Sequence, residues 1–308
     1  MPQTSSAAEA RTWFEPFGQQ DFGAHWNAIR PLCINEAGWP FGIMHIGHFD
    51  GLETPHLESH TADELAIAYV YLATCFFCMD HLYDHESKND FEILATSLCL
   101  ERATARISNA LQKLNLDVSV GHIEIAKLLH KFTEAMVLER KIKSSIELHD
   151  ESLERSHTIG RSWLVIFAYR LIQQIKGRPV VVQAQALLEE GIYLLQLGDD
   201  WGDWREDFRS GNWNTFLRRC FFDIGRLPKH EGELERYIYL SGAYEQQGRM
   251  ISRGLKKVAS GLAKIYGQRG RGFNSVIELC RARADAVVQN FERVKRGLPP
   301  LPIPGAVQ

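Results

Sequence analysis

The sequence has no strong excess of either charge and few cysteines, and both shortages exclude classes of protein. Its 308 residues include 35 Lys and Arg against 38 Asp and Glu, a formal net charge of -3, so there is no electrostatic reason to expect nucleic acid as a partner. The 6 cysteines are scattered, without the density of a secreted disulfide framework. This composition fits a reducing compartment, and we expect a cytoplasmic protein with a small-molecule substrate.

Long hydrophobic segments that target or anchor a protein are also missing. The first residues contain no basic region followed by an apolar run, so no signal peptide is predicted. The longest uncharged run, residues 65–79, has 15 residues and falls short of the roughly 18 to 20 that a spanning helix needs. We predict that this run is a buried core helix and that the chain has no membrane span.

Strand-like sequence is scarce as well. Alternating β-branched runs are rare, whereas apolar residues recur at spacings of three and four along most of the chain. This pattern predicts an all-α protein, a single domain over residues 1–308 with flexible ends at 1–10 and 298–308. The segment 38–55 contains several glycines and is expected to be an irregular loop. The predicted helices cover residues 62–85, 90–114, 119–147, 151–176, 180–208, 212–222, 231–267 and 272–296.

Two acidic clusters each end a long apolar stretch. Asp80 and Asp84 end the first, and Asp199, Asp203 and Asp207 end the second. Carboxylates four residues apart lie on one face of a helix, where they repel one another unless cations or donors compensate them. Carboxylate oxygens are ligands for hard cations such as Mg²⁺. The spacing therefore predicts two metal-binding helix faces that together hold several Mg²⁺ ions around a diphosphate.

These clusters resemble the two metal-binding motifs of the class I terpene synthases. Residues 80–84, D-H-L-Y-D, are similar to the D-D-x-x-D motif of that family, with His81 in place of the second aspartate. Residues 199–207 are similar to its second motif, (N/D)-D-x-x-(S/T/D)-x-x-x-(E/D), with aspartates at the three ligand positions. The order of the motifs and their separation of 119 residues also suit the family.

A third match precedes the second motif. Many bacterial members of the family carry an arginine a little over forty residues before it, in a stretch like R-x-x-T-x-G, that contacts the diphosphate. The stretch R-S-H-T-I-G begins at Arg155, 44 residues ahead of Asp199. The resemblance makes Arg155 the diphosphate sensor and predicts a helix break near Gly160. The Arg-Tyr pair that the family has near its C-terminus is not evident, since no tyrosine follows Arg281 or Arg283.

The resemblance also implies an antiparallel helical bundle around a central apolar cavity, with Mg²⁺, or Mn²⁺ in its place, as the cofactor. Three ions are expected. Asp80 with Asp84 would hold two of them, and Asp199, Asp203 and Asp207 would hold the third. Together with the arginine sensor, Asp80 and the second triad are the expected catalytic residues.

Two further sets of residues are assigned around the metals. Arg205 and Arg209 join Arg155 as expected diphosphate ligands, although pairing with neighbouring acids explains them equally well. Asn214 is expected to cap a helix. A carbocation requires a dry pocket lined with aromatic faces. The candidates for that lining are Phe76, Phe77, Tyr83, Trp163, Tyr193, Trp201 and Trp204.

The expected function is that of a terpene cyclase. Such an enzyme ionises an allylic prenyl diphosphate of fifteen or twenty carbons, or a pre-cyclised diterpenyl diphosphate, and releases pyrophosphate with a terpene hydrocarbon or alcohol. One alternative is a prenyl transferase of the squalene and phytoene or chain-elongating type, and another is a noncatalytic helical binding protein. A zinc site is a further alternative, although four ligands in a line do not easily surround one ion. Its ligands would be Cys75, Cys78, His81 and His85. The expected partner is the prenyl diphosphate, and a homodimer is left open.

Overall fold

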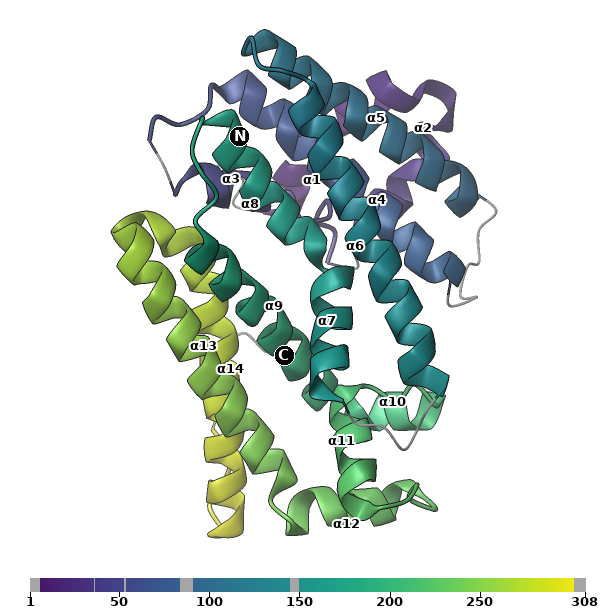
Figure 1. Cartoon of the computed structure of the whole chain (residues 1–308). Coiled ribbons are helices and arrows are strands. Elements are labelled where there is room, and N and C mark those ends of the chain that lie inside the picture. Colours follow the sequence, from purple (N-terminus) through teal and green to yellow (C-terminus); the bar gives the residue numbers. More distant parts are fainter. Residues whose placement is uncertain (1–5, 36, 53, 84–90, 145–149, 302–308) are drawn as a thin grey trace. The chain divides into compact units, whose positions relative to one another are not determined.

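Helices make up the architecture of the protein (Figure 1). The computed structural model describes residues 6–35, 37–52, 54–83, 91–144 and 150–301. These ranges contain no strand, and an isolated bridge pairs Ile34 with Pro40, so the all-α prediction is confirmed. The helices are α1 Ala7–Phe22, α2 Trp26–Ile29, α3 His45–Asp50, α4 Ser59–Tyr83, α5 Phe91–Lys113, α6 Ser119–Ser144, α7 Glu151–Arg161, α8 Trp163–Ile175, α9 Val182–Gly202, α10 Trp204–Ser210, α11 Thr215–Ile224, α12 Glu231–Leu240, α13 Ala243–Tyr266 and α14 Arg271–Lys295, with the 3₁₀ helices η1 Gly23–His25, η2 Arg30–Cys33 and η3 Gly267–Gly270.

The helices group into two compact units. Unit 1 comprises Met1–Leu129 and Leu164–Val180, and unit 2 comprises His130–Trp163 and Val181–Gln308. The chain therefore passes from one unit to the other within α6, at the start of α8 and just before α9. The single-domain arrangement stays a prediction, and the two units are described separately below.

Unit 1 is built around α4, which packs side by side with α5. Arg106 of α5 joins both helices to α1, because its guanidinium donates to Asp21 at 2.6 Å and to Glu64 of α4 at 2.7 Å. By length and composition α4 is apolar enough to cross a membrane, and it is longer than the uncharged run in the sequence. Because 67% of its most apolar window is buried inside the protein, α4 is typical of a core helix.

In unit 2, α9 packs against α13, and α13 lies side by side with α14 (Figure 1). Two glycines of α13 face α9, and leucine side chains of α9 fill the space beside them. A Cβ added to Gly254 would lie 2.6 Å from Leu194 Cδ1, and one added to Gly261 would lie 2.6 Å from Leu187 Cδ1. The two helices therefore approach more closely than side chains at these positions would permit.

The structure divides three of the predicted helices and adds others. The predicted helix 151–176 breaks at Ser162, 180–208 breaks at Asp203, and 231–267 breaks between α12 and α13. The irregular loop expected over 38–55 was partly wrong, because it contains α3. The N-terminal helix α1 was not predicted, and it includes residues 7–10 of the end that was expected to be flexible.

The end of α7 at Arg161 confirms the prediction of a helix break near Gly160. The helix leaves regular geometry at Ser162, where φ is -97° and ψ is 14°. Gly160, two residues earlier, lies against the backbone of α6. A Cβ at this position would be 2.7 Å from Ala135 Cβ and 2.9 Å from the carbonyl oxygen of Lys131. The glycine therefore permits a close contact between α6 and α7.

This contact reverses the usual effect of replacing a helical glycine with alanine. In an open helix position the change stabilises by about 1 kcal/mol. For Gly160→Ala we expect a loss of about 1 to 3 kcal/mol in the free energy of unfolding, since neither the Lys131 carbonyl nor the short Ala135 side chain can move aside easily. The control is Gly198→Ala in α9, where an added Cβ meets nothing within 4 Å. Urea unfolding measures both, and equal stabilisation by the two substitutions would contradict the close contact.

Candidate functional site

The three aspartates of the second motif keep helical spacing across a helix break. Helix α9 ends at Gly202, Asp203 is its C-cap, and α10 begins at the next residue. The backbone hydrogen bonds nevertheless continue, from Asp203 N–H to the Asp199 carbonyl at 2.9 Å and from Asp207 N–H to the Asp203 carbonyl at 3.1 Å. The carboxylates of the triad therefore follow one another along one side of the chain.

The carboxylates of the triad interact electrostatically. The pKa of Asp199 is raised above its usual value, first by partial desolvation, although the residue is exposed, and then by the negative charges of Asp203 and Asp207. In the part of the chain that the structure describes, no side chain donates a hydrogen bond to Asp199 or Asp203. Both carboxylates therefore keep their oxygen lone pairs available for a ligand.

Asp207 and Asp200 are held by the start of α11. Asn214 caps this helix by accepting from Leu217 N–H at 2.9 Å, as expected, and its amide donates to Asp207 Oδ2 at 2.6 Å. Asp200 accepts from the backbone N–H of Thr215 at 3.0 Å. Asp200 is therefore a structural residue that fastens α11 to the end of α9, a role that the acidic motif itself does not reveal.

Arg155 lies on α7 and contacts α9. Its Nη2 is 2.5 Å from Glu190 Oε2, and its guanidinium carbon lies 5.0 Å from the centre of the Tyr193 ring. Asp150 caps α7 and so fixes where the helix begins. The structure therefore places the predicted diphosphate sensor beside the predicted cavity residue Tyr193. It also reveals Glu190, which the sequence analysis did not single out.

The residue before Arg155 forms a buried ion pair. Glu154 accepts from Arg218 Nε of α11 at 3.1 Å, and Arg218 Nη1 donates to the carbonyl of Ile142 at 2.8 Å. The side chains of Glu154 and Arg218 are only 3% and 4% exposed. Helix α11 therefore contacts the acidic motif at its first turn and α7 one turn later.

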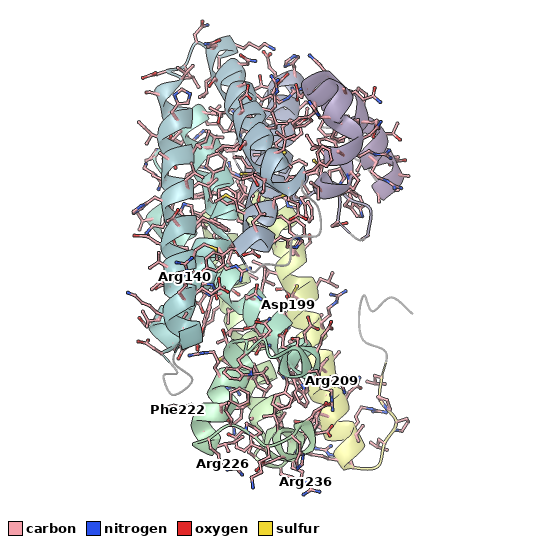
Figure 2. The ribbon with its side chains drawn as sticks, turned by 90° about the vertical axis from the view of Figure 1, so that its right-hand side faces the viewer. Arg140, Asp199, Arg209, Phe222, Arg226 and Arg236 are labelled. Atoms are coloured by element: carbon pink, nitrogen blue, oxygen red, sulfur yellow. The ribbon has the colours of Figure 1, made fainter. Side chains whose placement is uncertain are left out.

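Arg205 and Arg209 face α12. Arg205 pairs with Glu235 and lies 4.5 Å from the ring centre of Trp204, and Arg209 Nε donates to Glu231 at 2.8 Å. These ion pairs account for the positions of both arginines without a diphosphate. The acids that pair with them lie on α12, whereas the sequence analysis expected acids close by in the sequence. Figure 2 labels Asp199 on α9 and Arg209 on α10. Two other arginines, Arg226 and Arg236, lie lower in that view, at the end formed by α11 and α12.

Of the aromatic residues of unit 2 that were predicted to line a cavity, Trp163 lines one, whereas Trp201 and Trp204 are buried. Trp201 packs on Tyr244, with ring centres 4.6 Å apart, so packing accounts for its position, and Trp204 is also buried. Trp163 lines a cavity of about 590 Å³ between α6, α7 and α9. Its wall combines apolar side chains such as Val137 and Leu138 with charged ones such as Lys131 and Glu134.

The first acidic cluster belongs to unit 1. Asp80 is half-buried in the last turn of α4, and Asp84 and His85 lie outside the described residues. His81 Nδ1 is 3.7 Å from Glu92 Oε1 of α5. Phe76 is buried, the Phe77 ring lies tilted against His81 with ring centres 4.0 Å apart, and Tyr83 is half-buried. The residue that replaces the second aspartate of the motif is therefore next to a carboxylate of the neighbouring helix.

The carboxylate oxygens of the triad are the type of ligand that a hard cation such as Mg²⁺ prefers. Among the described residues, however, no group of three or more His, Cys, Asp or Glu side chains is close enough to enclose a metal ion. This result gives no support to a zinc site at Cys75 and Cys78, which are both buried. Mg²⁺ needs fewer protein ligands, because it keeps several waters and takes oxygens from phosphate groups. The open carboxylates of Asp199 and Asp203 fit that mode of binding.

Comparison with known proteins identifies the fold. A solved structure of a geranylgeranyl pyrophosphate synthase matches 90% of this chain and 99% of its own, with a TM-score of 0.64 and 12% identity. The fold is that of the isoprenoid synthases. No family model and no curated protein matches the sequence. At 12% identity this likeness shows the architecture of the chain and does not show its reaction.

Proposed function

We propose that this protein is a class I terpene cyclase, which ionises an allylic prenyl diphosphate and guides the resulting carbocation to a cyclic terpene. The observation that carries the proposal is the pair of open carboxylates, Asp199 and Asp203, in a triad on an isoprenoid synthase fold, with Arg155 on the adjoining helix. Neighbouring carboxylates that no donor compensates favour binding of a cation, since the cation relieves their repulsion.

Each group has a separate task in this proposal. Asp199, Asp203 and Asp207 would hold Mg²⁺, which when bound neutralises the charge that develops on the departing pyrophosphate. Asn214 keeps the Asp207 carboxylate in place through its 2.6 Å hydrogen bond. Arg155 would bind the phosphate oxygens, for which its planar guanidinium is well suited. In unit 1, Asp80 and Asp84 are proposed to bind the other two metal ions.

The hydrocarbon part of the substrate needs aromatic and apolar surroundings that exclude water. Tyr193 is buried beneath the Arg155 guanidinium, and Trp163 lines the cavity of unit 2, so both are proposed to contact the prenyl chain. The proposed protein works in the cytoplasm with a prenyl diphosphate as its partner, and a homodimer is compatible with this role.

A prenyl transferase is the second candidate, because the solved structure that shares the fold is named as a geranylgeranyl pyrophosphate synthase. The two candidates differ in what happens to the cation. A cyclase closes it within one substrate, whereas a transferase joins it to a second prenyl unit and yields a longer linear chain.

The deciding experiment is incubation of the protein with ten, fifteen and twenty carbon diphosphates, each with Mg²⁺ and each with or without a second, five-carbon diphosphate. We expect pyrophosphate release and a cyclic hydrocarbon or alcohol of unchanged carbon number, detected by mass spectrometry. A longer linear diphosphate formed only with the second substrate would favour the transferase. Full activity in EDTA would contradict the metal-dependent mechanism.

A further inference from the structure

Helix α7 carries two ion pairs on adjacent residues, and these pairs differ in burial. The side chains of Glu154 and Arg218 are 3% and 4% exposed, whereas those of Arg155 and Glu190 are 35% and 36% exposed. Breaking a buried pair leaves charge in a site that water does not reach. Breaking a half-buried pair costs less, because water can replace the lost partner. Helix α7 is therefore anchored at one residue and carries an exchangeable arginine at the next.

The position of Arg155 in this structure is remote from the acidic triad. Glu190 and Tyr193, its two contacts on α9, precede Asp199 by nine and six residues. These spacings correspond to roughly 13 and 9 Å along the helix axis, and Glu190 and Tyr193 point about 180° and 120° away from Asp199 around it. A diphosphate on the triad can bind Arg155 only if the guanidinium turns away from Glu190.

We propose that Glu190 retains Arg155 in the free protein and that the substrate diphosphate competes with Glu190 for its guanidinium. This inference rests on the proposed function, in which the triad and Arg155 bind the diphosphate. Glu190 is a positioning residue in this scheme, since it acts on the substrate only through Arg155. The exchange replaces a carboxylate by a phosphate group, and both present oxygen pairs that fit a guanidinium.

The surroundings of the pair suit such an exchange. Glu190 is exposed enough to be hydrated when its partner leaves. The Tyr193 ring lies under the guanidinium, and this cation–π contact stabilises the positive charge of Arg155 at the surface of α9. The Glu154 to Arg218 pair fixes the adjacent residue of α7 to α11, so in this scheme the Arg155 side chain moves while its helix stays in place.

The test is calorimetric titration of the protein with inorganic pyrophosphate in the presence of Mg²⁺. Glu190→Gln is expected to bind pyrophosphate about 2- to 5-fold more tightly than wild type, because the competing carboxylate is removed. The matched control is Glu189→Gln, which removes the adjacent charge from a carboxylate that accepts from Gln185 and not from Arg155. It should leave the affinity near that of wild type. In an Arg155→Gln background, Glu190→Gln should give no gain.

Results other than these overturn either the role of Glu190 or the proposed diphosphate site. If Glu190→Gln binds no more tightly than Glu189→Gln, or if its gain persists without Arg155, Glu190 does not compete for that guanidinium. Asp199→Asn separates this failure from a failure of the proposed function. If wild type and Asp199→Asn bind pyrophosphate equally weakly, the triad is not a diphosphate site, and both proposals are overturned.

Discussion

Asp203→Asn is expected to reduce diphosphate-dependent turnover by a factor of about 100 or more while leaving the protein folded. The physical reason is that Asp203 is the middle carboxylate of the triad, where the proposed function requires a negative charge to hold the metal. Asp203 is exposed and no described side chain donates to it, so the substitution removes no protein contact. Asparagine preserves the shape of the side chain but removes the charge that a cation needs. Turnover is measured as pyrophosphate release with the substrate that the incubations identify.

The stability of the same variant distinguishes a functional from a structural aspartate. Removing one of the carboxylates that raise the pKa of Asp199 relieves repulsion, so the free energy of unfolding should stay equal or rise by up to about 0.5 kcal/mol. The control is Glu206→Gln, which neutralises an exposed acid of α10 that lies off the ligand positions. Full turnover in Asp203→Asn, or its loss together with folding, would contradict the assignment of Asp203 to the site.

Arg218→Met is expected to reduce the free energy of unfolding by about 3 to 5 kcal/mol, the largest stability effect that we predict. The substitution takes the guanidinium from the buried Glu154 carboxylate and a hydrogen bond from the Ile142 carbonyl. Helix α11 then loses its contact with α7 and its contact with the end of α6 together. Urea unfolding, followed by circular dichroism, measures the change.

Two further variants identify the cause of that loss. The double variant Glu154→Leu with Arg218→Met removes both charges and should be more stable than Arg218→Met alone, because no buried carboxylate then lacks its arginine. Arg209→Met breaks the exposed pair with Glu231 and should reduce the free energy of unfolding far less than Arg218→Met does, because water replaces the lost partner. If Arg218→Met costs no more than Arg209→Met, the buried pair does not anchor α7.

The sequence predicted the long helices well because their signals are local. Apolar spacing located α4, α5 and α9, and the pair Gly177 and Pro179 lies where α8 ends. Helix α1 was missed because it contains Pro16, which is unfavourable inside a helix, together with Gly18. The ring of Trp26 lies over Gly18, where an added Cβ would be 2.3 Å away, so tertiary packing accounts for this part of α1.

In the candidate site too, features set by local sequence were predictable and long-range partners were not. The spacing of Asp199, Asp203 and Asp207 is a local property, and the backbone hydrogen bonds retain it although the helix breaks. The partners of Arg155 could not be predicted, because Glu190 lies 35 residues away along the chain and no local rule connects the two. Arg205 and Arg209 likewise pair with acids of α12 that only the fold brings near.

The close contact of α9 with α13 restricts how the protein can respond to substrate. Leu187 and Leu194 fit against Gly261 and Gly254, so α9 can neither shift toward α13 nor slide along it without a clash. Helix α9, which carries Asp199 and ends at Asp203, is thus held closely against α13. Rearrangement around a bound diphosphate must come from side chains such as Arg155 or from the exposed ion pairs between α10 and α12.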